Sequence, residues 1–156
     1  MGGWWLNFTR GSVGNVMSMM MDCSSGATAA RRERIALEAK TSLMSNLADS
    51  VFPDVCDAWG SPDLGDSFRA PVHSTVPTLF ISGTLDGRTP ISNAEEYAAG
   101  FTRAHHLILD GAVHSDPLFL SSPKILETMI ALLRDQALPP RMTVVVDPPK
   151  WTAPEM

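Results

Sequence analysis

The sequence has no excess of positive charge and no long apolar run. Its 156 residues include 12 Lys and Arg against 17 Asp and Glu, so the net charge of −5 offers no basic surface to nucleic acid. No stretch approaches the roughly 18 uninterrupted apolar residues that a membrane-spanning helix requires. With 44% hydrophobic residues, the chain can still bury one ordinary core. We therefore expect a soluble chain with no nucleic-acid partner and no membrane span.

Residues that build metal clusters or disulfide frameworks are also scarce. Cys23 and Cys56 are the only cysteines, which are too few for a zinc cluster or a disulfide framework but sufficient for one bridge. His105 and His106 are adjacent, and neighbours on a strand point to opposite faces, so the two rings are not expected to share an ion. The sequence predicts no metal site and no cofactor.

Residues 1–74 are expected to form a helical and loop segment. Its start is rich in Gly and Met and contains apolar side chains that prefer burial: Trp4, Trp5, Met17, Met19, Met20 and Met21. These side chains either pack against a neighbouring helix or form an interface left by missing chain. From about Ala30 to Val51, apolar residues recur every four positions, which predicts an amphipathic helix that Pro53 ends.

Residues 75–138 have the pattern of a β-α-β-α unit. The apolar runs 79–81 and 107–109 predict strands buried on both faces. Thr89 as N-cap and Pro90 in the first turn predict a helix between these strands. A second helix is expected near the end of the unit, with one apolar stripe: Leu126, Met129, Ile130 and Leu133. Strands separated by a helical crossover pair in parallel, so the predicted fold class is α/β.

Such a unit is incomplete by itself, because two parallel strands leave both edges of the sheet open. Further strands are therefore required. Residues 139–156 are expected to form an extended tail. Within it, Met142 to Asp147 lies between pairs of prolines and is interpreted as an extended arm, the one segment of the tail that could add a strand.

A carboxylate and an imidazole follow the two predicted strands. Asp86 comes after the first strand and His114 after the second. In an open α/β sheet, the loops beyond the carboxyl ends of the strands meet at one crevice, so both side chains are expected at a common site. A carboxylate that accepts a hydrogen bond from Nδ1 of an imidazole leaves Nε2 to take a proton from a nucleophile. Acid before histidine is also the order of the α/β-hydrolase triad.

The residues around both positions carry a family resemblance. Residues 82–90 read S-G-T-L-D-G-R-T-P, and residues 111–114 read G-A-V-H. This pattern resembles the C-terminal part of α/β-hydrolases of the tripeptidyl-aminopeptidase-like (TAP-like) and prolyl-aminopeptidase-like group. The resemblance implies the fold of an α/β-hydrolase C-terminal portion. It also implies that Asp86 is the triad acid and His114 the triad base.

The resemblance extends to the cysteines. Residues 56–59, C-D-A-W, are similar to the C-x-x-W element of the family, and Cys23 lies where secreted relatives often place the partner of that cysteine. A Cys23–Cys56 disulfide and an extracytoplasmic location are thus implied by the resemblance. Residues 1–14 themselves lack the cationic start, the continuous apolar region and the small-residue cleavage site of a secretory signal.

The sequence departs from the family at the nucleophile. The triad serine requires a G-x-S-x-G turn between a strand and a helix, and this motif does not occur; the nearest segments, 10–14, 22–26 and 65–69, each lack one glycine. The chain therefore resembles the acid-and-base half of a serine hydrolase that cleaves peptide or ester bonds through an acyl-enzyme. On this hypothesis, a missing N-terminal half or another chain supplies the nucleophile, and the isolated chain is inactive. The alternative is a truncated, non-catalytic remnant that acts as a folded or self-associating binding module.

Overall fold

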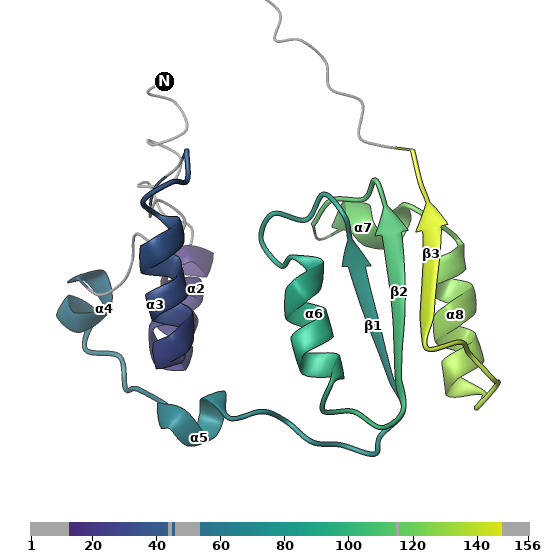
Figure 1. Ribbon diagram of the computed structural model, residues 1–156, viewed down its shortest axis with the longest axis horizontal. Coiled ribbons are helices and arrows are strands. Elements are labelled where there is room, and N and C mark those ends of the chain that lie inside the picture. Colours follow the sequence, from purple (N-terminus) through teal and green to yellow (C-terminus); the bar gives the residue numbers. More distant parts are fainter. Residues whose placement is uncertain (1–12, 44, 46–53, 115, 148–156) are drawn as a thin grey trace, which may run out of the picture. The chain divides into compact units, whose positions relative to one another are not determined.

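The computed structural model describes residues 13–43, 45, 54–114 and 116–147. The chain divides into two compact units, Met1–Ala70 and Pro71–Met156, and each is described here by itself (Figure 1). Within the described residues, no helix is both long enough and apolar enough to cross a membrane.

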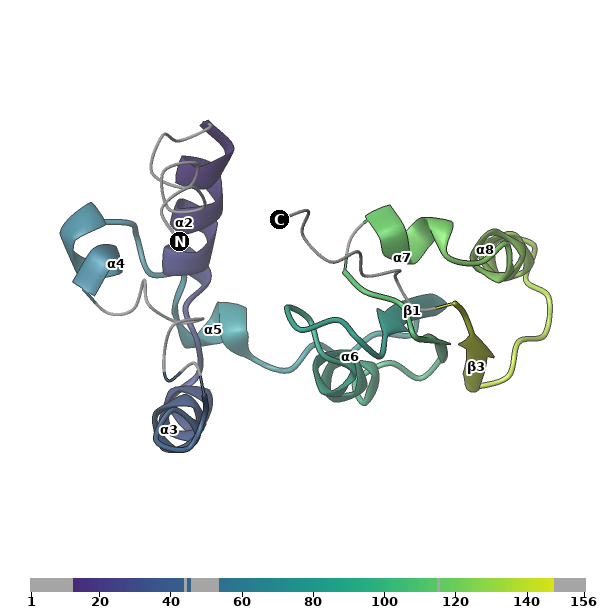
Figure 2. The ribbon, with the colours of Figure 1, turned by 90° about the horizontal axis from the view of Figure 1, so that it is seen from above.

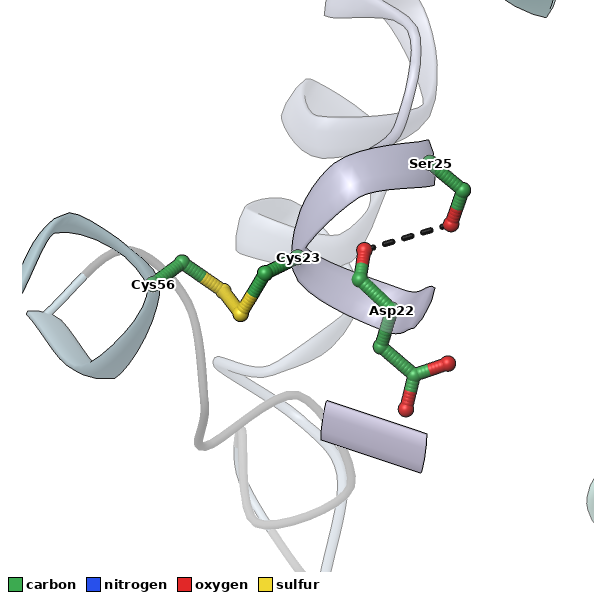
Figure 3. The surroundings of a disulfide bond; sticks show 4 residues. All are labelled: Asp22, Cys23, Ser25 and Cys56. Atoms are coloured by element: carbon green, nitrogen blue, oxygen red, sulfur yellow. Dashed lines mark hydrogen bonds between the residues drawn. A yellow bond between two sulfur atoms is a disulfide. The ribbon is translucent and has the colours of Figure 1, made fainter. Parts of the chain in front are cut away.

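The described part of the first unit is helical. Its helices are α2 (Val13–Ser25), α3 (Ala29–Glu38), α4 (Asp54–Trp59) and α5 (Gly65–Arg69). A disulfide between Cys23 and Cys56 joins α2 to α4, with 5.2 Å between the two Cα atoms (Figure 3). The bridge that the family resemblance implied is confirmed. Trp4 and Trp5, which were expected to be covered, lie outside the described residues.

A second link in this unit is Arg69, which ties α5 to the end of α2. Its Nη1 donates to the backbone oxygen of Ser25 at 2.9 Å and to a carboxylate oxygen of Asp63 at 2.6 Å. Its Nη2 lies 3.3 Å from a carboxylate oxygen of Asp66. The guanidinium group therefore contacts two carboxylates, Asp63 and Asp66, and also binds the carboxyl end of α2 through the Ser25 carbonyl.

The helix expected from Ala30 to Val51 is shorter than the apolar periodicity indicated. It ends at Glu38, and residues 39–43 are turn and coil. The Thr41 hydroxyl donates to the Glu38 carbonyl at 3.3 Å, a local side-chain bond that competes with helix continuation. The prediction was therefore wrong beyond Glu38 in the described part, and residues 46–53 lie outside it.

The second unit is built on a parallel sheet. Its strands, in spatial order, are β1 (Thr78–Gly83), β2 (Ala104–Asp110) and β3 (Arg141–Val145). Its helices are α6 (Ile91–Ala98), α7 (Asp116–Leu120) and α8 (Lys124–Leu133). Figure 2 shows α6 on one face of the sheet and α7 and α8 on the other. The predicted α/β class and the β-α-β-α order are confirmed.

The expected extended arm at 142–147 is part of this sheet. β3 pairs in parallel with β2, with Leu107 opposite Met142 and Leu109 opposite Val144. Met142 and Val144 face the same core as the two leucines. Alternate side chains of β3 are half-buried, so pairing with β2 removes apolar surface of this strand from solvent.

β1 lies at an edge of the sheet. Most of its residues are only half-buried, in contrast to the burial on both faces that was expected.

The core of the unit lies between the sheet and the helices α7 and α8. Leu107 and Leu109 are fully buried there, against Leu118 of α7 and Ile125 of α8. The apolar stripe predicted for this helix is exposed on α8: Leu126 62%, Met129 41%, Ile130 38% and Leu133 83%. α8 buries Ile125 and Thr128, and the Thr128 hydroxyl is satisfied by the Lys124 carbonyl at 2.7 Å. Because both faces of this helix carry apolar residues, periodicity alone selected the wrong one.

The face of the sheet toward α6 contains a buried polar pair. Nε2 of His106 lies 2.9 Å from Oγ of Ser82, and both residues are buried. Burial, aided by the positive charge of Arg141 and opposed by Glu95, lowers the pKa of His106 below its ordinary value.

This shift predicts an acid-sensitive stability. As the pH falls below about 6.5, unfolded His106 binds a proton more readily than the folded residue, so the free energy of unfolding should decrease with decreasing pH. Urea unfolding followed by circular dichroism between pH 8 and pH 5 measures the slope. A His106→Asn variant should lose less stability over this range than the wild type, and equal losses would contradict the assignment.

Candidate active site

Asp86 lies in the turn that follows β1, and its carboxylate is almost enclosed by hydrogen-bond donors. The side chain is 3% exposed. Oδ1 accepts from the backbone amides of Arg88 at 2.9 Å and Thr89 at 2.8 Å. Oδ2 accepts from the Thr89 hydroxyl at 2.6 Å and contacts Nδ1 of His114 at 2.8 Å. The carboxylate therefore has a fixed orientation, with one oxygen directed at the imidazole.

Burial raises the pKa of Asp86, but the hydrogen bonds from Thr89, His114 and Arg88 together outweigh it. The net effect holds the pKa well below the ordinary range of a carboxyl group. Asp86 is thus ionised throughout the neutral range of pH. A permanently charged acceptor stabilises a proton on Nδ1 of His114 and, when the ring is doubly protonated, the imidazolium.

Thr89 has a different role from the helix cap that the sequence predicted. α6 begins at Ile91, the cap position is Pro90, and no side chain caps the helix. The hydroxyl of Thr89 donates to Asp86 instead, and it lies 3.2 Å from Nδ1 of His114. The Thr-Pro pair was visible in the sequence, but nothing local distinguishes a capping threonine from one that holds a carboxylate.

His114 comes from the loop after β2 and is the more accessible partner. Its side chain is 39% exposed, and the hydrogen bond predicted between His114 and Asp86 is confirmed. With Nδ1 directed at Asp86, the lone pair of Nε2 has no hydrogen-bond partner among the described residues. The second ring nitrogen is therefore available to a group outside this part of the chain.

Direct contacts between the two loops explain why these side chains meet. The Leu85 amide donates to the Ala112 carbonyl at 2.9 Å. The Thr84 hydroxyl donates to the Asp110 carboxylate at 2.9 Å and accepts from the Gly111 amide at 2.8 Å. These bonds join the carboxyl ends of β1 and β2, close in sequence to Asp86 and His114. The residues that hold the two strand ends together are not identified by the apolar periodicity of the sequence.

The sequence comparison agrees with this geometry. The family model described as TAP-like protein, an α/β-hydrolase family, matches residues 41–144. The chain belongs to the TAP-like α/β-hydrolase family. No curated protein and no solved structure shows significant similarity to it. The matched range includes both loops of the site, β1, β2 and most of β3.

The serines nearest to a nucleophile motif are not placed as the turn of an α/β-hydrolase would require. Ser24 and Ser25 lie in α2, and Ser67 lies in α5, so none of them follows a strand. Ser82 is inside β1, where its hydroxyl is buried against His106. Ser12 lies outside the described residues. Within the described part of this TAP-like chain, the site thus consists of the Asp86–His114 pair and the residues that hold it.

Gly83 is required by the close approach of the two loops. A Cβ at this position would lie 2.4 Å from the backbone oxygen of Ala112 and 3.1 Å from that of Val113. Gly83→Ala should therefore force the loops apart, weaken the Asp86–His114 hydrogen bond and destabilise the second unit by roughly 1–3 kcal/mol. Urea unfolding measures the loss. The matched control is Gly87→Ala, because nothing lies within 4 Å of a Cβ there.

The geometry also predicts the neutral tautomer of His114. Because Asp86 is a charged acceptor next to Nδ1, the proton of the neutral ring should reside on Nδ1, which leaves Nε2 as the acceptor. Nitrogen-15 chemical shifts of the ring at alkaline pH distinguish the two tautomers. Asp86→Asn should reduce the preference, and a wild-type ring protonated mainly on Nε2 would be inconsistent with a triad base.

Proposed function

We propose that this chain supplies the acid and the base of a serine hydrolase that cleaves peptide or ester bonds through an acyl-enzyme. The observation that carries the proposal is the 2.8 Å hydrogen bond from Nδ1 of His114 to Oδ2 of Asp86. Membership of the TAP-like family supports the reaction class. Asp86 is the orienting acid, His114 is the general base, and Thr89 is a positioning residue that acts through Asp86.

The proposed reaction uses Nε2 of His114 twice. In acylation, Nε2 accepts the proton of a serine hydroxyl as the serine oxygen bonds to the substrate carbonyl carbon. The imidazolium, stabilised by Asp86, then donates this proton to the leaving amine or alcohol as the bond to the carbonyl carbon breaks. In deacylation, Nε2 accepts a proton from water, whose oxygen attacks the acyl carbon, and returns it to the serine.

The nucleophile in this proposal is a serine on a G-x-S-x-G turn of another polypeptide segment, because the sequence itself contains no such motif. The same segment would supply the oxyanion hole. The substrate of the complete site is a peptide or an ester. The missing motif also favours a second candidate, a non-catalytic remnant that self-associates or binds a partner.

A fluorophosphonate probe distinguishes the two candidates, since it labels only activated serines. The chain alone is expected to remain unlabelled. A second polypeptide that carries a G-x-S-x-G motif and is encoded by a neighbouring gene should be labelled at its serine when this chain is added. The His114→Ala variant of this chain should not promote that labelling. Labelling that is independent of this chain would favour the remnant. Labelling of the isolated chain would show that a serine within it completes the site.

A further inference from the structure

The first unit carries an open groove between α2 and α5 that is separate from the Asp86–His114 pair. Its volume is about 620 Å³, within the range of small-molecule sites. Most of its lining is apolar, and the lining residues are Met17, Met20, Met21, Asp22, Ser24, Ser25, Leu64 and Phe68. Every one of these residues belongs to the first unit.

The apolar side chains of this groove are unusually open to solvent. Met17 is 63% exposed, Met21 62% and Phe68 58%. Large apolar side chains gathered in one open concave surface indicate a binding surface, because isolated exposed residues are common but clusters are not. Methionine side chains are flexible and polarisable, so a groove lined by three of them can adapt to ligands of different shapes. Of the two alternatives that the sequence left open for these methionines, cover by a neighbouring helix is not met for Met17, Met20 and Met21 in the described residues.

One charged residue, Asp22, is part of the lining of the groove. The Asp22 carboxylate has no hydrogen bond and no ion pair with any residue that the structure describes, and it points away from the Cys23–Cys56 bridge (Figure 3). The nearby cation Arg69 is bound to Asp63 and Asp66 and donates to the Ser25 carbonyl. The negative charge of the groove is therefore not neutralised by this arginine.

The carboxyl end of α2 adds no further attraction for a cation, because Arg69 already donates to the Ser25 carbonyl there and the Leu64 amide donates to the Ser24 carbonyl. The apolar floor and the carboxylate of Asp22 are together complementary to a ligand with a hydrocarbon body and one positive charge.

We propose that this groove binds small amphiphilic cations, in which a primary ammonium group pairs with Asp22 and an alkyl or aryl-alkyl body packs on the methionines and Phe68. The proposal rests on the first unit alone and does not depend on hydrolase activity. It identifies a ligand class by charge and shape: one ammonium group at the end of a chain long enough to reach the apolar floor.

Titrations of the full, disulfide-bonded chain with 4-phenylbutylamine test the proposal. With carbon-13 in the methionine methyl groups, the signals of Met17, Met20 and Met21 should shift with a single dissociation constant, each signal being assigned through its own Met→Leu variant. The neutral analogue 4-phenylbutanol and the anion 4-phenylbutyrate should bind more weakly, in that order. Asp22→Asn should raise the dissociation constant for the amine roughly 1.5- to fivefold, the range for an exposed ion pair, and remove the preference over the alcohol.

The matched control is Asp57→Asn, an exposed carboxylate of the same unit that does not line the groove. It should leave binding of the amine unchanged. Equal affinities for the amine and the alcohol, or an equal effect of both substitutions, would overturn the role of Asp22. If a second copy of the chain fills the groove, sedimentation velocity will show self-association. The methionine signals will then depend on protein concentration and the amine will not shift them, which also overturns the proposal.

Discussion

Replacing His114 with alanine in the assembled hydrolase is expected to lower kcat by on the order of 10⁶-fold, and Asp86→Asn by roughly 10⁴-fold. On the proposed mechanism, the first substitution removes the general base that accepts the proton of the serine. The second leaves the imidazole in place but removes the charge that fixes its tautomer and stabilises the imidazolium. Initial rates of release of an arylamine from an aminoacyl arylamide measure both effects.

The matched control for this prediction is His73→Ala, an exposed histidine of the same unit that has no place in the site. It should leave kcat within about twofold, a difference of less than half a kcal/mol in the barrier. Combining the two catalytic substitutions should cost little more than His114→Ala alone, because the two side chains act as one unit. A hydrolase that retained wild-type kcat without His114 would refute the proposed role of the pair.

The sequence predicted the parts of the site that depend on strand topology. The runs 79–81 and 107–109 are short, apolar and separated by a helix-length segment, so their parallel pairing follows from general rules of chain connection. Once they are parallel, their carboxyl ends must share an edge. The meeting of Asp86 and His114 was therefore predictable from their positions directly after the two runs.

Prediction from the sequence was wrong where a side chain or a helix face has two possible partners that the local sequence does not distinguish. Thr89 could cap α6 or bind Asp86, and only the folded loop brings the carboxylate within 2.6 Å of its hydroxyl. α8 has apolar residues on both faces, and the side that it buries is decided by contact with Leu107 and Leu109 rather than by its own pattern. Similarly, α3 ends at Glu38, where the Thr41 hydroxyl donates to the Glu38 carbonyl, although the apolar periodicity of the sequence continues.

Removal of the Cys23–Cys56 bridge is expected to unfold the first unit while leaving the second intact. In the described part of the first unit, Cys23 is the only buried hydrophobic residue, and α3 buries none. The two cysteines are 33 residues apart, so their bridge should stabilise the unit by about 3–4 kcal/mol through restriction of the unfolded chain. A unit with so small a core has little other stabilisation to offset this loss.

A double Cys23→Ser, Cys56→Ser variant tests the difference between the units. Amide exchange of α2 and α4 should become fast, whereas the protection of Leu107 and Leu109 and the Nδ1 proton of His114 should persist, because the core of the second unit contains no residue from the first. Reduction of the wild-type bridge should reproduce the variant, which separates loss of the crosslink from any effect of the serine side chains. Slow exchange in α2 after either treatment would mean that Arg69 and its contacts hold the first unit together without the bridge. Loss of the His114 signal would mean that the Asp86–His114 pair depends on the helical unit, although among the described residues every hydrogen bond to the Asp86 carboxylate comes from the second unit itself.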